Sequence, residues 1–134
     1  MDPIIIAALL LLQTWAPDVY QTASRYEIQE VQYEAYSGMA ICEQGIIKIS
    51  LPQNLTAEKA AGTLAHEAKH LNDGCPTYNN SGRLLYREAA AYRYQLQALR
   101  NVGASVALQD KATAGYWKFW WREHGLVRSL GILP

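Results

Sequence analysis

The chain has 134 residues, of which 50% are hydrophobic and 18% are charged. This length and balance are typical of one globular domain spanning residues 1–134, and they exclude a disordered chain. Its 12 Lys and Arg residues balance its 12 Asp and Glu residues, and the basic residues are scattered, so nucleic acid is not an expected partner.

The first predicted element is a helix from about Pro3 to Trp15. Asp2 stands in the N-cap position and Pro3 at the first helical position, where each is favoured. The apolar run from Ile4 to Leu12 is too short to cross a bilayer, and no Lys or Arg precedes it as in a secretory signal. We therefore favour a buried helix over a cleaved signal in residues 1–16. Membrane association is not expected, and a cytoplasmic location is favoured over secretion.

A second helical stretch follows Pro17, from Asp18 to about Ser24. The next segment is rich in residues that favour strands, with imperfect alternation of apolar and polar side chains. Gly45 supplies the positive φ that a tight connection needs between two of the strands. We expect a small antiparallel sheet of about three strands, formed by residues 28–35, 39–42 and 46–51.

Thr56 is placed to cap a helix from Ala57 to about Asn72. His66 and His70 are four residues apart, so on a helix both imidazoles face the same way and can bind one metal ion. Glu67 is the middle residue of this HExxH pattern and can reach a water bound to that metal. The apolar stripe lies on the opposite face: Ala60, Ala61, Leu64, Ala68 and Leu71.

After a polar loop at residues 77–82, a further helix is predicted from about Arg83 to Val102. Glu88 falls within its inward stripe, where an unpaired carboxylate would be costly, so it needs a cation or a metal as partner. An ion pair with an arginine is the alternative to a metal ligand, but the nearby arginines mostly point to other faces. The stripe contains Leu84, Leu85, Glu88, Ala91, Tyr92, Gln95 and Leu99. Two histidines and one glutamate leave a fourth position open for water, which is typical of a catalytic zinc site.

His66-Glu67-Ala68-Lys69-His70, followed eighteen residues later by Glu88, resembles the gluzincin class of zinc metallopeptidases. The resemblance covers roughly residues 38–99 and implies a zincin-like α+β fold. It implies that His66, His70 and Glu88 hold Zn²⁺ and that Glu67 is the general base in hydrolysis of a peptide or protein substrate. The strand at residues 46–50 resembles the edge strand that aligns an extended peptide above the metal.

The chain departs from the class at Tyr92, one turn after Glu88. Many gluzincins have an acidic residue there that orients a ligand histidine, whereas Tyr92 supplies no charge. The residue that stabilises the oxyanion is not fixed by the motif; Tyr78, Tyr92 and His124 are the candidates. For His124, a role at the end of the last helix is the favoured alternative. The aromatic stripe before it is expected to complete the core, formed by Tyr116, Trp117, Phe119, Trp120 and Trp121.

Two cysteines, Cys42 and Cys75, leave two alternatives open: one disulfide in an exported protein, or two buried thiols. Cys75 also follows His70 closely enough to approach the metal site. For function, the sequence favours a zinc-dependent endopeptidase. The alternative is a catalytically silent zincin-like module that binds metal and acts in protein interaction or regulation.

Overall fold

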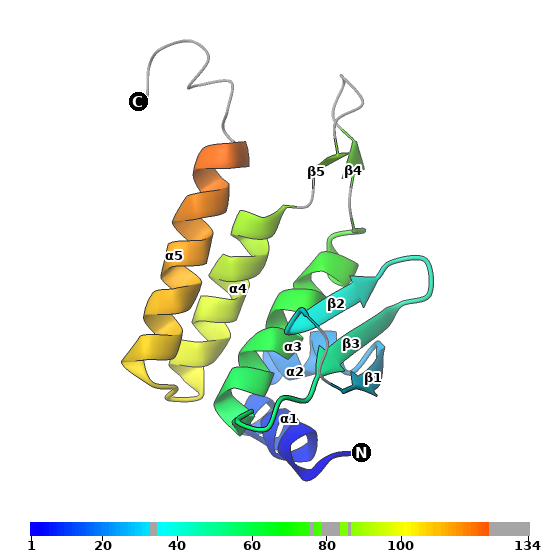
Figure 1. Ribbon diagram of the computed structural model, residues 1–134, viewed down its shortest axis with the longest axis vertical. Helices are drawn as coiled ribbons and strands as arrows, with labels where there is room; N and C mark the ends of the chain where they lie inside the picture. The colour runs from blue at the N-terminus through cyan, green and yellow to red at the C-terminus, as the bar shows by residue number, and fades with distance from the viewer. Residues whose placement is uncertain (33–34, 76, 79–83, 86, 124–134) are drawn as a thin grey trace.

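The computed structural model describes residues 1–32, 35–75, 77–78, 84–85 and 87–123 (Figure 1). It confirms the α+β class: the described residues form five helices, a three-stranded sheet and a short two-stranded sheet. Helix α3 (Ala57–Asn72) is central, because the larger sheet, the two N-terminal helices and α4 (Glu88–Asn101) all contact it. Helix α5 (Val106–Glu123) packs on α4.

Helix α1 (Pro3–Trp15) and helix α2 (Pro17–Ala23) break at Ala16, as the proline pattern predicts. The Asp2 side chain accepts a hydrogen bond from the backbone N–H of Ile4 at 2.8 Å, so the predicted cap is confirmed. Among the described residues, no helix combines the length and apolarity that crossing a bilayer requires. The apolar run is instead a core helix, with three side chains fully buried: Ile5, Ala8 and Leu12.

The larger sheet contains β1 (Glu27–Val31), β2 (Gly38–Ile41) and β3 (Ile46–Ser50), in the order β1-β3-β2. Strands β2 and β3 form the predicted antiparallel hairpin, and Gly45 in its turn has φ 65°. Strand β1, however, runs parallel to β3. The sheet is therefore mixed, and the expectation of a purely antiparallel sheet was wrong. The chain crosses from β1 to the opposite edge before the hairpin begins, so β1 and β3 share a direction.

Helix α3 has the predicted bounds, and the Thr56 side chain accepts a hydrogen bond from the backbone N–H of Lys59 at 3.2 Å. Small residues let its neighbours approach closely. A Cβ added at Gly62 would lie 2.9 Å from a Leu99 methyl of α4. Five apolar residues of α3 are fully buried: Ala60, Ala61, Leu64, Ala65 and Ala68. The helix that carries both histidines is thus fixed in the core on the side away from them.

Helix α4 begins at Glu88, five residues later than the expected start at Arg83. Strands β4 (Thr77–Tyr78) and β5 (Leu84–Leu85) pair in an antiparallel sheet just before it. Arg87 then takes the left-handed conformation with φ 54°, which a right-handed helix cannot continue. Glu88 therefore lies in the first turn of α4 rather than in the middle of the helix.

The aromatic stripe of α5 is partly exposed rather than part of the core. Trp117 is 50% exposed, and among the described residues of α5 only Ala112 is buried. The expectation of a core stripe was wrong because α5 is the outer helix and has its main contact with α4 alone (Figure 1).

Candidate metal centre

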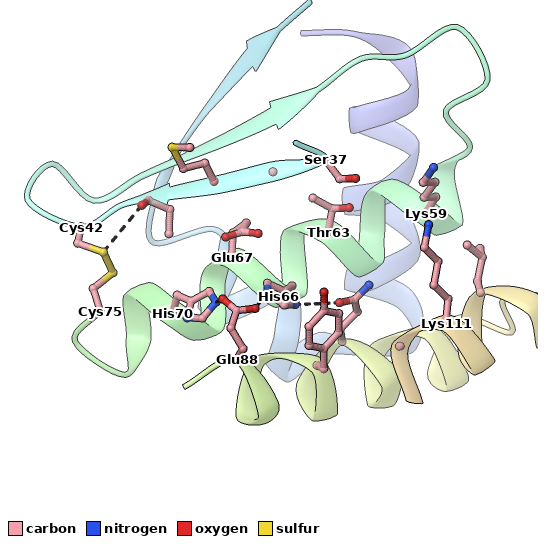
Figure 2. A pocket seen from close by; sticks show the side chains of 17 residues that line it. Ser37, Cys42, Lys59, Thr63, His66, Glu67, His70, Cys75, Glu88 and Lys111 are labelled. Carbon is pink, nitrogen blue, oxygen red and sulfur yellow. Dashed lines mark hydrogen bonds and ion pairs between the residues drawn. A yellow bond between two sulfur atoms is a disulfide. The ribbon is translucent and has the colours of Figure 1, made fainter. Parts of the chain in front are cut away.

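A cleft of about 480 Å³ lies between β2 on one side and α3, α4 and α5 on the other (Figure 2). His66 and His70 face it from α3 with only 8% and 9% of their surfaces exposed, and Glu67 beside them is 9% exposed. The opposite face of α3 is packed in the core, so the prediction that the histidines point away from the apolar stripe is confirmed.

His66, Glu67 and His70 form a group that can hold a metal ion. One ligand atom from each lies within 4.8 Å of the other two. Glu88 reaches the same place from α4: its two carboxylate oxygens lie 3.1 Å from Nε2 of His66 and 2.8 Å from Nε2 of His70. The structure therefore brings together the four residues that the sequence had singled out for metal chemistry.

These separations fit a metal bound between the three side chains. Ligand atoms about 2.0–2.1 Å from a tetrahedral zinc ion lie roughly 3.3 Å from one another. The oxygen–nitrogen distances of Glu88 are a few tenths of an ångström shorter. Two imidazole nitrogens and a carboxylate oxygen are also ligands that zinc prefers, so the residues fit the ion by type and by spacing.

Both ring nitrogens of His66 lie within hydrogen-bond distance of a side chain of α4. Its Nδ1 lies 2.9 Å from the amide oxygen Oε1 of Gln95, while Nε2 faces Glu88. Burial lowers the pKa of His66, but the hydrogen bond to Glu88 and the charges of Glu67 and Glu88 outweigh burial and raise the pKa above 6.5. A proton on Nδ1 bonded to Gln95 would leave Nε2 to coordinate a metal ion, so the Gln95 contact fits the tautomer that coordination requires.

Gln95 was not recognised as a functional residue from the sequence. The signal was present, since Gln95 stands seven residues after Glu88 in the same inward stripe. Residues seven apart lie two turns along one helix face, so a polar side chain there can reach the same site as Glu88.

Glu67 points toward β2 rather than toward α4 (Figure 2). Its carboxylate accepts a hydrogen bond from the backbone N–H of Ala40. Burial raises the pKa of Glu67 above 4.5, and the neighbouring histidines and the Ala40 bond oppose that rise without cancelling it. A carboxylate with a raised pKa is a stronger base than a free carboxylate, so it is better suited to accept a proton.

Glu88 is less buried than expected, with 24% of its side chain exposed. Burial acts to raise its pKa, but the hydrogen bonds from His66 and His70 lower the pKa to about 2. Its ion pairs within the described part of the chain are both with these histidines. For the arginines that the structure describes, the alternative ion pair is therefore not observed; Arg83 lies outside the described residues.

Tyr92 lines the cleft, and its ring lies edge-on against His66 with 4.6 Å between ring centroids. The Phe119 ring stacks on Tyr92 at 5.7 Å between ring centroids, and a Cβ at Gly115 would lie 2.5 Å from the Tyr92 ring. Burial, with the charges of Glu88 and Glu67, raises the pKa of Tyr92 above 10, so the hydroxyl keeps its proton. Helix α5 thus packs against the Tyr92 ring, and the ring lies beside His66.

The other two oxyanion candidates are not brought to the site by what the structure describes. Tyr78 is placed only by its backbone, in β4. His124 lies outside the described residues, one position beyond the end of α5. Both remain predictions from the sequence.

A disulfide joins Cys42 to Cys75, so the two cysteines pair and neither acts as a free metal ligand. It connects the chain just after β2 to the chain just after α3, and both cysteines line one end of the cleft. The bridge therefore fixes the edge strand against the helix that carries the histidines (Figure 2).

The strand beside the cleft is β2, not β3. Strand β3 is the central strand, and β2 is the edge strand whose residues Gly38, Met39 and Ala40 line the cleft. The expectation that residues 46–50 form the edge strand was therefore wrong, because β1 pairs with the outer side of β3.

Comparisons of this chain with protein-family models, with curated proteins and with solved structures each gave no match.

Proposed function

We propose that this protein is a zinc-dependent endopeptidase of the gluzincin type. The observation that carries the proposal is the meeting of Nε2 of His66 and Nε2 of His70 on the carboxylate of Glu88, with Glu67 beside them. Three protein ligands leave one position of a tetrahedral ion for water, as hydrolytic zinc sites require.

In this proposal His66, His70 and Glu88 are the ligands and Glu67 is the general base. A zinc ion bound there would lower the pKa of a coordinated water and polarise the carbonyl of a peptide bond. Glu67 accepts the proton of the attacking water and returns it to the leaving amine, a role that its raised pKa supports. Glu88 keeps its charge at all physiological pH values, because its pKa is about 2.

Tyr92 is the residue that we assign to the oxyanion. Its hydroxyl stays protonated, and its ring is held between His66 and Phe119 on the wall of the cleft. A donor that is already oriented stabilises developing negative charge without reorganising during the reaction.

The test is Glu67→Gln compared with wild type on unfolded protein substrates. We expect the variant to bind one zinc ion per chain as the wild type does and to lose hydrolysis by about a hundredfold or more, since general-base catalysis contributes on that order. Glu58→Gln is the matched control, because Glu58 lies in the first turn of the same helix and does not line the cleft.

Hydrolysis by Glu67→Gln at the wild-type rate would overturn the assigned role. If the wild type binds zinc fully and cleaves neither unfolded protein nor peptide libraries, the protein is instead the metal-binding module without catalysis.

The disulfide bears on where the proposed enzyme works. Structural disulfides persist in oxidising compartments and are rare in the reducing cytosol. We therefore propose an exported or otherwise oxidising location, in place of the cytoplasmic location that the sequence favoured.

A further inference from the structure

The two ends of the cleft differ in charge. The only carboxylates among its described lining residues are Glu67 and Glu88, both at the histidines. At the end beyond Ser37 and Thr63, the cleft is lined by two lysines, Lys59 of α3 and Lys111 of α5 (Figure 2). The opposite end is closed by the disulfide.

Neither lysine is neutralised by the residues that the structure describes. Within those ranges the ion pairs are Lys69 with Asp73 and the two histidines with Glu88, and none involves Lys59 or Lys111. Two ammonium groups from different helices thus leave one end of the cleft with uncompensated positive charge. A ligand that supplies a negative group there would be favoured.

The same end of the cleft has room for such a group. A second cavity of about 210 Å³ adjoins it and shares Ser37, Lys59 and Thr63 with the cleft. Lys59 therefore lies between the cleft and a recess large enough for one side chain or for the end of a peptide.

The free edge of β2 sets the direction in which a peptide would lie. The backbone carbonyl of Ser37 accepts a hydrogen bond from Ser50 and so faces β3, which leaves the backbone groups of Gly38 and Ala40 to face the outer edge. Glu67 already accepts the N–H of Ala40, so a peptide would pair with the other groups of this edge. A peptide added to this edge pairs more favourably in the antiparallel sense. Since β2 runs from Ser37 toward Cys42, the C-terminal part of such a peptide lies at the lysine end (Figure 2).

The distance along α3 between Lys59 and His66 indicates where the charged group would lie in a bound peptide. Lys59 precedes His66 by seven residues, which is about 10 Å along a helix at 1.5 Å per residue. An extended peptide advances about 3.3 Å per residue, so roughly three residues span this distance.

We propose that Lys59 and Lys111 bind a carboxylate of the substrate about three residues to the C-terminal side of the cleaved bond. This inference rests on the proposed peptidase activity and names its substrate class: peptides with an acidic side chain or a free C-terminal carboxylate at that place. The lysines select substrate and do not take part in the chemical step.

The experiment first identifies cleaved bonds in a degenerate peptide library by mass spectrometry. Three synthetic peptides with the same cleaved bond then separate the two sources of charge. The first peptide has Glu three residues after the bond and an amidated C-terminus. The second has a neutral side chain at that position and ends at it in a free carboxylate. The third has a neutral side chain at that position and an amidated C-terminus.

We expect the neutral peptide to be cleaved about three- to tenfold less efficiently than the better charged one, the range that two partly exposed ion pairs supply. The double variant Lys59→Gln/Lys111→Gln should remove this preference mainly through KM, and Lys111→Glu should favour a peptide with Lys at the same place. Lys118→Gln is the control, because Lys118 is exposed on α5 and does not line the cleft.

Equal cleavage of the charged and neutral peptides, or a preference for acid on the N-terminal side of the bond, would overturn the inference and leave the peptidase standing. A preference that survives in the double variant would also overturn it. If no peptide is cleaved, the proposed function fails and the inference falls with it.

Discussion

His66 is the residue whose surroundings define the site most completely. One ring nitrogen faces the amide oxygen of Gln95 and the other faces Glu88. Without a metal, both nitrogens face acceptors, which stabilises the doubly protonated ring. If a metal ion were bound at Nε2, His66 would lose the proton there and keep the proton on Nδ1 that faces Gln95.

Loss of the Gln95 acceptor should therefore weaken metal binding. We predict that Gln95→Leu raises the zinc dissociation constant about 10- to 100-fold, the usual effect of removing the partner of a ligand histidine. Gln95→Glu should keep the affinity near wild type, because a carboxylate also accepts the Nδ1 proton. Zinc titration against a competing chelator measures both.

Gln97→Leu is the control, since Gln97 is exposed on the same helix and bonds to Asn101. Equal zinc affinity in Gln95→Leu and Gln97→Leu would show that Gln95 does not orient His66.

The titrating groups also predict how pH changes the stability of the metal-free protein. Glu88 has a pKa lowered to about 2, so its stabilisation is present above 4.5 and is lost as the pH falls toward 2. The raised pKa of His66 gives stabilisation that is present below 6.5 and lost as the pH rises through the folded pKa. Because the pKa of Glu67 is raised above 4.5 in the folded protein, ionising this carboxyl is harder there than in the unfolded chain. Its contribution to the free energy of unfolding therefore falls as the pH rises above 4.5.

For these three groups, the free energy of unfolding without metal should be greatest near pH 4.5, should fall above that pH because of Glu67, and should fall further above pH 6.5 because of His66. Urea unfolding in the presence of a chelator at pH 3, 4.5, 6.5 and 8.5 measures it. A His66→Gln variant should lose part of the decline above pH 6.5. A metal-free stability that rises steadily to pH 8.5 would contradict the assigned shifts.

At the scale of elements, local sequence was enough to predict α3 and the face from which its histidines project. Its cap at Thr56, its apolar stripe and its two histidines all lie within one continuous segment, and the helix has the expected bounds. The start of α4 depends instead on the β4–β5 pairing and on the left-handed Arg87, neither of which the spacing of apolar side chains encodes. Glu88 could still be identified because its charge is unusual in an apolar stripe, wherever the helix begins.

The sheet shows the same limit. The hairpin of β2 and β3 is local and was predicted, whereas the parallel pairing of β1 is a tertiary contact that alternation of side chains does not encode. That pairing makes β3 central, and so it decides that β2 lines the cleft. The residues that line the cleft from β2 could not be chosen from the sequence for this reason.

Gly38 allows β2 to lie close to α3. A Cβ at this position would lie 2.5 Å from the Thr63 methyl and 3.1 Å from Cγ of Glu67. We predict that Gly38→Ala destabilises the protein by about 1–3 kcal/mol, the usual cost of overpacking, and displaces Glu67 or β2. Urea unfolding and the rate of peptide cleavage measure the two effects.

The second variant makes the cause specific. Thr63→Ser removes the methyl that the new Cβ would meet, so the double variant Gly38→Ala/Thr63→Ser should recover part of the lost stability. If the two substitutions have additive effects on the free energy of unfolding, a clash between the new Cβ and the Thr63 methyl is not the cause of the destabilisation.

At the scale of the whole molecule, the site lies where segments from most of the chain meet. One side of α3 packs in the core. Phe119 of α5 stacks on Tyr92 of α4, and the Cys42–Cys75 disulfide lines the far end of the cleft. Glu123 at the end of α5 also accepts a hydrogen bond from the backbone N–H of Ala89 at 3.1 Å, which secures the first turn of α4 beside Glu88. The geometry of the site therefore depends on the packing of several elements.

The disulfide should contribute strongly to this assembly. It closes a loop with a sequence separation of 33. Chain entropy for a loop of this size corresponds to about 3–4 kcal/mol. We predict that Cys42→Ser/Cys75→Ser lowers the free energy of unfolding by about this amount, measured by urea unfolding.

The wild type after reduction should match the double variant, and reduction should leave the double variant unchanged. Equal unfolding midpoints for oxidised and reduced wild type would show that the bridge does not stabilise the fold.

The central claim is that two histidines from α3 and one glutamate from α4 bind a single metal ion, and zinc titration of metal-free protein tests it most directly. We predict one zinc ion per chain for the wild type, and an affinity lower by at least a hundredfold in His70→Ala and in Glu88→Ala. Failure of the wild type to bind zinc, or binding that these two substitutions leave unchanged, would contradict the account.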